Sequence, residues 1–411
     1  MCQKRPRSGS IRPRLATCVL VWKRRVETKN TVSTKPQRLL FFVTEDWYFC
    51  SHRLPIALAA KQAGFDVWVI TREMAHGDVI RDAGLTLFPI ALTRGGLHPL
   101  REMELLLRLV FAYRQIRPDI VHHVAMKPVI YGSIAARFVR GARVVNALGG
   151  LGYLFTSRDR MARLLRVVAE FWLGLALRRK GSVTLLQNPD DLTLLCGLGI
   201  VKRDSVSLIS GSGVDTRRFH PVPPPAGAIT VVLAARMLRD KGVLEFVEAA
   251  RQLGGLSPTL RFVLAGDNDP SNPASISSQQ LRAWVAEGVI EWRGWQDDMA
   301  AVYQNAHIAC LPSYREGLPK SLQEAAACGL PIVTTDVPGC REVVRAEQNG
   351  ILIPHRDATA LAKALARLIA DAPLRAKMGE KSREIAEREF SIQNVVAHTL
   401  ETYRSLLAAQ A

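Results

Sequence analysis

Two carboxylates separated by seven residues form the part of the sequence best suited to chemistry. Glu316 and Glu324 flank a segment that begins as a loop and continues as a predicted helix. Pro319 fits the first turn of that helix, where its missing N–H costs no hydrogen bond. Gly317 lets backbone approach a ligand closely, and the free N–H groups at a helix start bind anions. The segment therefore suits a ligand that carries both hydroxyl groups and a phosphate.

Two cations follow a predicted strand at residues 229–235. Arg236 and Lys241 lie five positions apart, directly before a predicted helix. A basic pair after a strand is more often solvated surface. At the carboxyl end of a parallel strand, however, both side chains can reach one diphosphate, and we expect them to do so.

Three glycine-containing turns accompany these groups. Residues 210–215 include Gly213 and Asp215 near a predicted domain junction, while residues 336–342 and 349–354 each lie beside a predicted strand. Each segment alone is equally consistent with ordinary turn chemistry.

Alternating short apolar strands and helices surround these motifs, which indicates parallel sheets covered on both faces. The strands of a first series are predicted at residues 39–43, 67–70, 86–89, 120–123 and 143–146, and those of a second at 229–235, 260–265, 289–292, 307–311 and 331–334. The fold class is therefore α/β, with two doubly wound Rossmann-like domains facing each other across a cleft. Ligands should bind at the carboxyl ends of the strands. The expected parts are a basic tail (1–37), an N-terminal domain (38–215), a linker (216–228), a C-terminal domain (229–390) and a final helix (391–411).

Charge is the compositional outlier of this 411-residue chain, whose net charge is +18. Residues 1–37 contribute +9, residues 38–203 contribute +10 and the remainder −1. Nucleic acid, an anionic membrane surface or an anionic substrate would each account for a basic N-terminal half. The seven scattered cysteines form no CxxC pair or Cys/His cluster, which argues against a disulfide scaffold and a structural zinc site.

The first 37 residues contain an apolar run, Leu15 to Trp22, that is too short to span a bilayer. No convincing small-residue cleavage site follows it, so a secretory signal is not expected. We interpret this tail as a disordered basic extension or an artefact of start-codon choice. As an alternative, the positive charge of this tail would add to the attraction between the protein and an anionic membrane.

Taken together and in this order, the motifs resemble the retaining glycosyltransferases of family 4, which have the GT-B fold. The resemblance covers residues 38–390 and includes the E-x7-E pair, Arg236 with Lys241 and Gly242, residues 213–215, residues 338–342 and the Asn349-Gly350 pair. The loops of the N-terminal half look like the CapM-like subgroup of capsule and O-antigen enzymes, which extend lipid-linked oligosaccharides. A glycine-rich loop found after the first strand in many family members is absent here.

The resemblance implies roles for individual residues on the donor side. Arg236 and Lys241 would hold the diphosphate of a nucleotide sugar. Glu316 would bind hydroxyls of the transferred sugar, and Glu324 those of the ribose. Backbone at Gly317 and Leu318 would touch sugar or phosphate, and residues around Arg293 would lie against the base, with Gly213 and Asp215 also on the donor side.

The N-terminal half should hold the acceptor. Three loops at predicted strand ends supply the candidates, of which His122 is the proposed catalytic one: Asp46, His52, His122, His123, Gly150 and Gly152. A lone histidine is more often structural than catalytic, and only the expected position at a strand mouth favours a role for His122.

A basic segment with an aromatic and aliphatic face, Arg158 to Lys180, suggests contact with an anionic bilayer surface. Packing of that face into its own domain explains the pattern equally well. The first interpretation places the protein in the cytoplasm, bound peripherally to the inner face of the plasma membrane.

The resemblance further implies transfer of a glycosyl group with retention from a nucleoside-diphosphate sugar to a polyprenyl-diphosphate-linked saccharide, without a cofactor or required metal. Two alternatives remain open at this point. A GT-B nucleotide-sugar epimerase would use the same cleft and need no acceptor. A basic nucleic-acid-binding protein is disfavoured by the neutral C-terminal half and by the lack of a recognisable nucleic-acid module.

Overall fold

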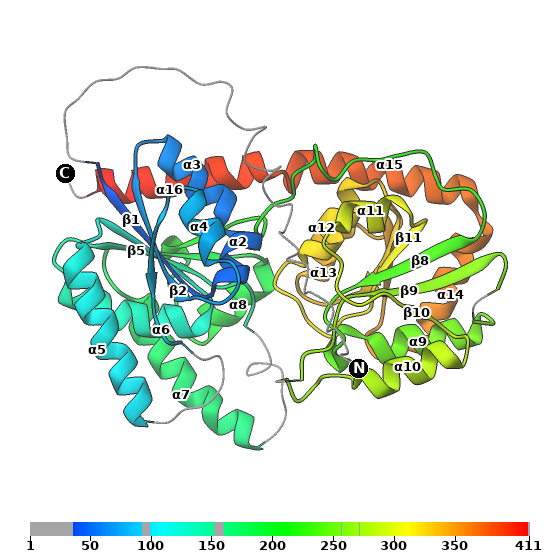
Figure 1. Cartoon of the computed structure of the whole chain (residues 1–411), viewed down its shortest axis with the longest axis horizontal. Coiled ribbons are helices and arrows are strands. Elements are labelled where there is room, and N and C mark those ends of the chain that lie inside the picture. The colour runs from blue at the N-terminus through cyan, green and yellow to red at the C-terminus, as the bar shows by residue number, and fades with distance from the viewer. Residues whose placement is uncertain (1–35, 93–98, 152–159, 256, 271, 410–411) are drawn as a thin grey trace, which may run out of the picture.

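The computed structural model describes residues 36–92, 99–151, 160–255, 257–270 and 272–409. Within these ranges the chain forms two α/β domains that lie side by side, each with a parallel sheet between helices (Figure 1). This architecture is the predicted GT-B-like arrangement. The predicted basic tail falls almost entirely outside the described residues.

The N-terminal domain contains a seven-stranded parallel sheet in the order β3-β2-β1-β4-β5-β6-β7. Its strands are β1 (Arg38–Glu45), β2 (Asp66–Arg72), β3 (Thr86–Pro89), β4 (Ile120–Val124), β5 (Arg143–Ala147), β6 (Ser182–Leu186) and β7 (Val206–Leu208). Its helices are α2 (Asp46–His52), α3 (Leu54–Gln62), α4 (Gly77–Asp82), α5 (Pro99–Ile116), α6 (Met126–Ala135), α7 (Arg160–Leu177) and α8 (Pro189–Gly197), with 3₁₀ turns at Ala136–Phe138 and Arg203–Ser205. Strands β6 and β7 extend the sheet beyond the strands predicted from sequence.

The C-terminal domain contains a six-stranded parallel sheet in the order β10-β9-β8-β11-β12-β13. Its strands are β8 (Ile229–Ala234), β9 (Leu260–Ala265), β10 (Glu291–Trp292), β11 (Ile308–Leu311), β12 (Ile332–Thr335) and β13 (Gly350–Ile353). Its helices are η5 (Arg239–Lys241, 3₁₀), α9 (Val243–Gln252), α10 (Ser278–Ala286), α11 (Met299–Gln304), α12 (Lys320–Ala327), α13 (Cys340–Val343), α14 (Ala358–Ala370) and α15 (Ala372–Glu389). In both sheets the strand order reverses at the centre, between β1 and β4 and between β8 and β11, which is where ligands of such folds bind.

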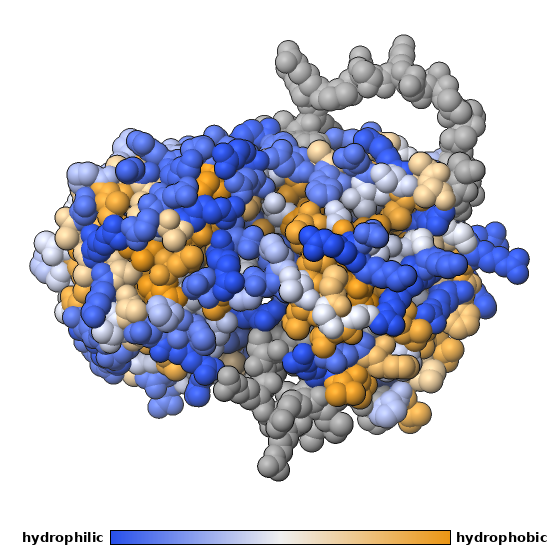
Figure 2. All heavy atoms as spheres, turned by 180° about the vertical axis from the view of Figure 1, so that it is seen from behind, coloured by the Kyte–Doolittle hydropathy of each residue, from blue (hydrophilic) through white to orange (hydrophobic). Residues whose placement is uncertain are grey.

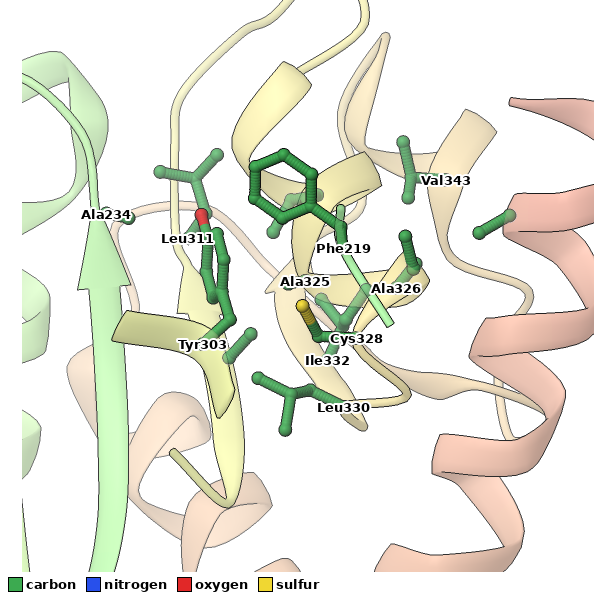
Figure 3. Packing of buried hydrophobic residues seen from close by; sticks show 14 of the residues in the cluster. Phe219, Ala234, Tyr303, Leu311, Ala325, Ala326, Cys328, Leu330, Ile332 and Val343 are labelled. Atoms are coloured by element: carbon green, nitrogen blue, oxygen red, sulfur yellow. The ribbon is translucent and has the colours of Figure 1, made fainter. Parts of the chain in front are cut away.

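Apolar packing fixes the direction of the helix that carries Glu324. Figure 3 shows Ala325 and Ala326 of α12, and Cys328 directly after this helix, near Phe219, Leu311 and Ile332 in the core of the C-terminal domain. Small residues let α12 lie close to the sheet, where it contacts β11 and β12. Phe219 belongs to the predicted linker, and its burial ties that segment to the C-terminal domain.

The chain crosses between the domains twice at one place. Val214 N donates to Phe390 O at 2.8 Å, and Ile392 N donates to Val214 O at 2.9 Å. After this second crossing, α16 (Ile392–Ala408) runs along the N-terminal domain beside α3 (Figure 1). Tyr403 of α16 is completely buried in the core beneath β1.

Two local expectations were wrong. The region from Thr44 to Arg53 was expected to be a loop, but it forms α2 directly after β1. His122 and His123 were expected at a strand mouth, but β4 continues to Val124 and pairs them with Phe41 and Phe42 in the middle of the sheet. The predicted strand (120–123) contained both histidines at its end, whereas β4 extends one residue further, to Val124.

Candidate functional site

An ion pair joins the two loops that leave the central strands of the C-terminal sheet. Lys241 Nζ lies 2.5 Å from Glu316 Oε1, and both side chains are largely buried. Gly242, with φ of 73°, lies so close to Pro312 O that any Cβ would overlap this oxygen. Tyr314 N also donates to Asp240 O at 2.9 Å. These backbone contacts hold Lys241 beside the Glu316 loop.

Glu324 lies one turn inside α12 and is buried. Burial raises the pKa of its carboxyl, and the nearby cations Lys320 and Arg218 partly offset that rise. Lys320 Nζ is 3.6 Å from Glu324 Oε1. The second acid of the motif is therefore buried, with the ammonium group of Lys320 as a neighbour.

The other two predicted donor-side cations each have a carboxylate neighbour. Arg236 Nη1 is 2.8 Å from Asp269 Oδ2, with nearly half of its side chain exposed. Arg293 Nη2 is 3.3 Å from Glu291 Oε2. Trp292 Nε1 donates to Gly266 O at 2.9 Å, which fixes the residues around Arg293 against the end of β9.

Gly317 lies in the contact between the domains. A Cβ at this position would overlap Gly149 O of the N-terminal domain. Gly150, with φ of 121°, approaches Gly317 from the same loop, and Gly339 approaches its carbonyl from the C-terminal domain. Leu318 is buried in the C-terminal core, so only its backbone is available to a ligand. The glycines allow three backbone segments to converge beside Glu316.

The first turn of α8 makes further contacts across the domain boundary, and the sequence analysis did not single out its residues. Asn188 Nδ2 donates to Gly317 O at 2.8 Å. Asp191 forms an ion pair with Arg315, and Asp190 Oδ1 lies 3.4 Å from Arg341 Nη1. The signal was an Asn-Pro-Asp-Asp run after β6, which is an N-cap followed by proline and two acids.

Lys320 is another residue that sequence reasoning missed. Its Nζ donates to Ser51 O of the N-terminal domain at 2.8 Å. Next to Ser51, the imidazole of His52 stacks on Tyr48 with ring centroids 4.1 Å apart. Burial lowers the pKa of His52, and the charges of Lys320 and Arg53 lower it further. Of the acceptor-side candidates, His52 and Gly150 thus lie where the two domains meet.

His122 and His123 do not lie at the domain boundary, so the catalytic assignment of His122 is wrong. His122 Nδ1 is 2.5 Å from Tyr403 Oη, and its ring stacks on Phe41. His123 faces the opposite side of the sheet, where Nδ1 is 2.8 Å from Asn146 Oδ1. Both side chains are completely enclosed, so neither reaches a substrate in this structure. Burial lowers the pKa of both rings, that of His123 to about 4.

Three further candidate residues, Asp46, Gly213 and Asp215, make contacts within the fold and not beside Glu316. The Oδ2 of Asp46 accepts from the N–H groups of Met74 and His76 at 2.6 and 2.8 Å, and the residue has no exposed surface. An acceptor-binding role for Asp46 is therefore contradicted. Gly213 lies against Ile392 and Asp215 accepts from Arg217 N, which places both at the chain crossing rather than beside Glu316. Gly152 lies outside the described residues.

The arrangement can bind a dianion and hydroxyl groups together. Lys241, the N–H groups before α12 and Lys320 supply positive potential, while Glu316 and Glu324 can accept hydrogen bonds from hydroxyls. A departing phosphate group would meet this positive potential as its charge develops. Among the described side chains, no group of three or more His, Cys, Asp or Glu residues could hold a metal ion.

Two family patterns match the chain. The pattern of Glycosyl transferases group 1 matches residues 216–385, and the Glycosyl transferase 4-like pattern matches residues 38–185. The two matches correspond to the C-terminal and N-terminal domains.

Curated relatives match most of the chain. An N,N'-diacetylbacillosaminyl-diphospho-undecaprenol alpha-1,3-N-acetylgalactosaminyltransferase from Campylobacter jejuni is 26% identical, with 81% of this chain and 90% of that protein covered. A UDP-Gal:alpha-D-GlcNAc-diphosphoundecaprenol alpha-1,3-galactosyltransferase from Escherichia coli is 25% identical over 75% of this chain and 81% of that protein. The capsular polysaccharide biosynthesis glycosyltransferase CapM from Staphylococcus aureus is 22% identical over 74% and 82%.

Solved structures share the fold. Sucrose-phosphate synthase from Thermosynechococcus elongatus superposes with a TM-score of 0.76 at 21% identity, covering 91% of this chain and all of that chain. HepE from Anabaena, in complex with UDP and glucose, superposes with a TM-score of 0.73 at 18% identity, covering 90% of this chain and all of that chain.

Proposed function

The chain belongs to the group 1 glycosyl transferases of the GT-B fold, and from this membership we propose a specific reaction for it. The enzyme moves a glycosyl group from a nucleoside-diphosphate sugar to a saccharide carried on a lipid-linked diphosphate, with retention of anomeric configuration. The product is an intermediate of a surface polysaccharide such as an O-antigen, capsule or exopolysaccharide. The curated relatives that act on undecaprenyl-diphosphate-linked acceptors support this choice of acceptor.

The observation that carries the proposal is the pairing of Lys241 with Glu316 at the carboxyl ends of the central strands. In the absence of donor the two charges neutralise each other. When a nucleotide sugar binds, Lys241 contacts the diphosphate, together with Arg236 released from Asp269. Glu316 then accepts hydrogen bonds from the sugar hydroxyls, and Glu324 from the ribose.

Charge stabilisation of the leaving nucleoside diphosphate supplies most of the catalysis in this proposal. Lys241 and the start of α12 stabilise negative charge as the glycosidic bond breaks. The acceptor hydroxyl attacks from the same face, and a donor phosphate oxygen takes its proton. We propose that these groups act without a metal or cofactor. Activity that survives a strong chelator would support this point.

We further propose that the N-terminal domain rests peripherally on an anionic membrane, where the lipid-linked acceptor resides. The outer face of α7 exposes Val167, Val168, Phe171, Trp172 and Leu175, and the outer face of α5 exposes Leu100, Met103, Leu107 and Phe111. Figure 2 shows hydrophobic residues along the lower edge of this domain, on the side of α5 and α7.

Positive charge accompanies this apolar surface. Arg179, at the end of α7, has its pKa lowered by burial and by the charges of Arg137 and Arg143 nearby. Arg137 is exposed and its Nη2 donates to Leu175 O of α7 at 3.0 Å, so this cation lies beside the apolar face, an arrangement that fits anionic headgroups. No helix within the described residues is long and apolar enough to cross a bilayer.

The decisive experiment incubates the purified protein with a panel of UDP- and GDP-sugars, with and without a polyprenyl-diphosphate-linked saccharide. Mass spectrometry of the lipid product identifies the sugar, and NMR of the new linkage identifies the anomer. Acceptor-dependent consumption of one donor supports the proposal. Conversion of a donor to an isomer without acceptor would establish the epimerase alternative instead.

A further inference from the structure

The loop that carries Glu316 is held from both domains. On the C-terminal side, Glu316 N donates to Pro338 O at 3.2 Å, and Lys241 pairs with the Glu316 carboxylate. On the N-terminal side, the first turn of α8 contacts the residues directly before and after Glu316, namely Arg315 and Gly317. The position of the acid therefore depends on a domain to which it does not belong.

We propose that Asn188 and Asp191 are positioning residues that set Glu316 for the donor only when the two domains are closed. Closure of the two domains then also completes the donor site, because it places Glu316. This inference rests on the proposed function, because it assigns a role in the same donor site.

Asn188 is fixed by two of its own hydrogen bonds before it reaches across. Its Oδ1 accepts from Asp191 N at 2.8 Å, which caps α8, and its Nδ2 donates to Asp191 Oδ2 at 3.1 Å. The same Nδ2 also donates across the boundary to Gly317 O at 2.8 Å. Since the cap orients the amide, the donor atom is aimed at the Gly317 carbonyl without further adjustment. Asn188 is almost completely buried, so water does not replace this bond in the closed state.

Asp191 makes the contact sensitive to domain position. Burial raises the pKa of its carboxyl, while the charge of Arg315 and hydrogen bonds from Arg315 and Asn188 oppose the rise. A buried carboxylate without its cation is strongly disfavoured. When the domains separate, both charges return to water, so the pair has two stable arrangements, closed and solvated.

The contacts of α8 involve the two residues adjacent to Glu316, so they do more than hold the two domains together. Asp191 binds the residue next to Glu316, and a side chain at Gly317 would overlap Gly149 O and the Gln187 side chain. A displacement of Arg315 is therefore transmitted to Glu316 through a single peptide unit. Misplacement of a catalytic group by about 1 Å can reduce a rate by about 10²-fold.

The test compares Asp191→Ala, Arg315→Gln and the double variant. Each single change is expected to lower kcat/KM for the donor by about 10- to 100-fold, with the acceptor KM changed by less than about threefold. The double variant should be no worse than the worse single variant, because both changes break one contact. Arg315→Gln leaves α8 unaltered, so it tests the proposal even if Asp191→Ala fails to fold. Glu287→Ala, which removes an exposed ion pair with Arg251, is the matched control.

Hydrogen exchange of the donor-free variants provides a readout that is independent of activity. Amides of residues 313–319 are expected to exchange faster in each variant, while those of β8 stay unchanged. Unaltered exchange in residues 313–319, additive kinetic losses or a rise in the acceptor KM as large as the rise in the donor KM would each overturn the inference. If the wild-type enzyme transfers no sugar, the proposed function fails, and the exchange data still decide whether α8 orders this loop.

Discussion

Lys241 Nζ lies 2.5 Å from Glu316 Oε1, although the two residues are 75 positions apart in the sequence. Their contact joins the loops that follow β8 and β11, the two central strands of the C-terminal sheet. The lysine precedes α9 and the glutamate precedes α12. Both side chains are largely buried, and the ion pair places their opposite charges against each other. Removal of either partner alone would leave a largely buried charge without a counter-ion, which is unfavourable.

Replacement of Lys241 by alanine tests the donor-phosphate role. Removing one preorganised cation should lower kcat by about 10²–10³-fold, or roughly 3–4 kcal/mol of transition-state stabilisation. Steady-state kinetics with the identified donor measures the effect. The exposed Lys363→Ala on α14 is the control, and near-wild-type turnover of Lys241→Ala would refute the assignment.

Glu324→Gln should separate function from stability. Burial raises the pKa of Glu324, so the folded protein binds its proton more tightly than the unfolded chain does. The contribution of this carboxyl to the free energy of unfolding is present at pH values below the ordinary glutamate pKa. It is lost as the pH rises through the raised pKa of the folded protein. The glutamine variant should therefore have a higher Tm than wild type near pH 8, with a smaller difference near pH 5.

The same variant should bind the donor more weakly, because an amide replaces a carboxylate that accepts from the ribose hydroxyls. We expect the donor KM to rise about tenfold, a value typical of one charge-assisted hydrogen bond. Glu401→Gln on the exposed face of α16 should change neither quantity. A lower Tm for Glu324→Gln at pH 8 would contradict the argument from burial.

The buried histidines predict loss of stability in acid. Burial lowers the pKa of His122, and that of His123 falls from 6.5 to about 4. Below pH 6.5 the unfolded chain therefore binds protons that the folded protein does not, so the free energy of unfolding decreases as pH falls toward about 4. Thermal unfolding followed by circular dichroism across this range measures the slope.

His123→Gln should reduce the slope of the free energy of unfolding against pH by the equivalent of up to one bound proton. His220→Gln, at an exposed position, should leave this slope unchanged. At pH 7.5, His122→Gln should lower stability by about 1–3 kcal/mol through its contact with Tyr403. Its turnover should stay within about threefold of wild type. A kcat loss of 10²-fold without unfolding would restore a catalytic role for His122.

Gly317→Ala tests the close approach of the two domains. The added methyl group would overlap Gly149 O, so the domains cannot close fully around the donor site. We expect kcat/KM for the donor to fall by at least about tenfold. Gly174→Ala on α7 meets no atom within 4 Å and should keep full activity. Equal activity of the two variants would show that closure does not depend on this contact.

Binding to lipid vesicles tests the membrane surface. Phe171→Glu on α7 and Phe111→Glu on α5 should each reduce co-sedimentation with phosphatidylglycerol vesicles, since both rings are about two-thirds exposed. Val285→Glu, an exposed apolar position on α10 of the C-terminal domain, should bind as wild type does. Equal binding of all variants, or no preference over phosphatidylcholine, would argue against the proposed surface.

The sequence by itself determined the two-domain α/β fold, and it predicted which residues lie on the donor side. Continuous apolar strands require sheets buried on both faces, and Lys241 and Glu316 each follow such a strand, so local order along the chain places them at one sheet edge. The tertiary structure decided what the histidines do: polar residues inside β4 interrupt the apolar pattern, and only their contacts with Tyr403 and Asn146 show that they belong to the core. It also decided that α8 contacts the Glu316 loop, because Asp191 and Arg315 are 124 residues apart and belong to different domains. Contacts between domains depend on how two independently patterned surfaces meet, and no local period in the sequence records that geometry.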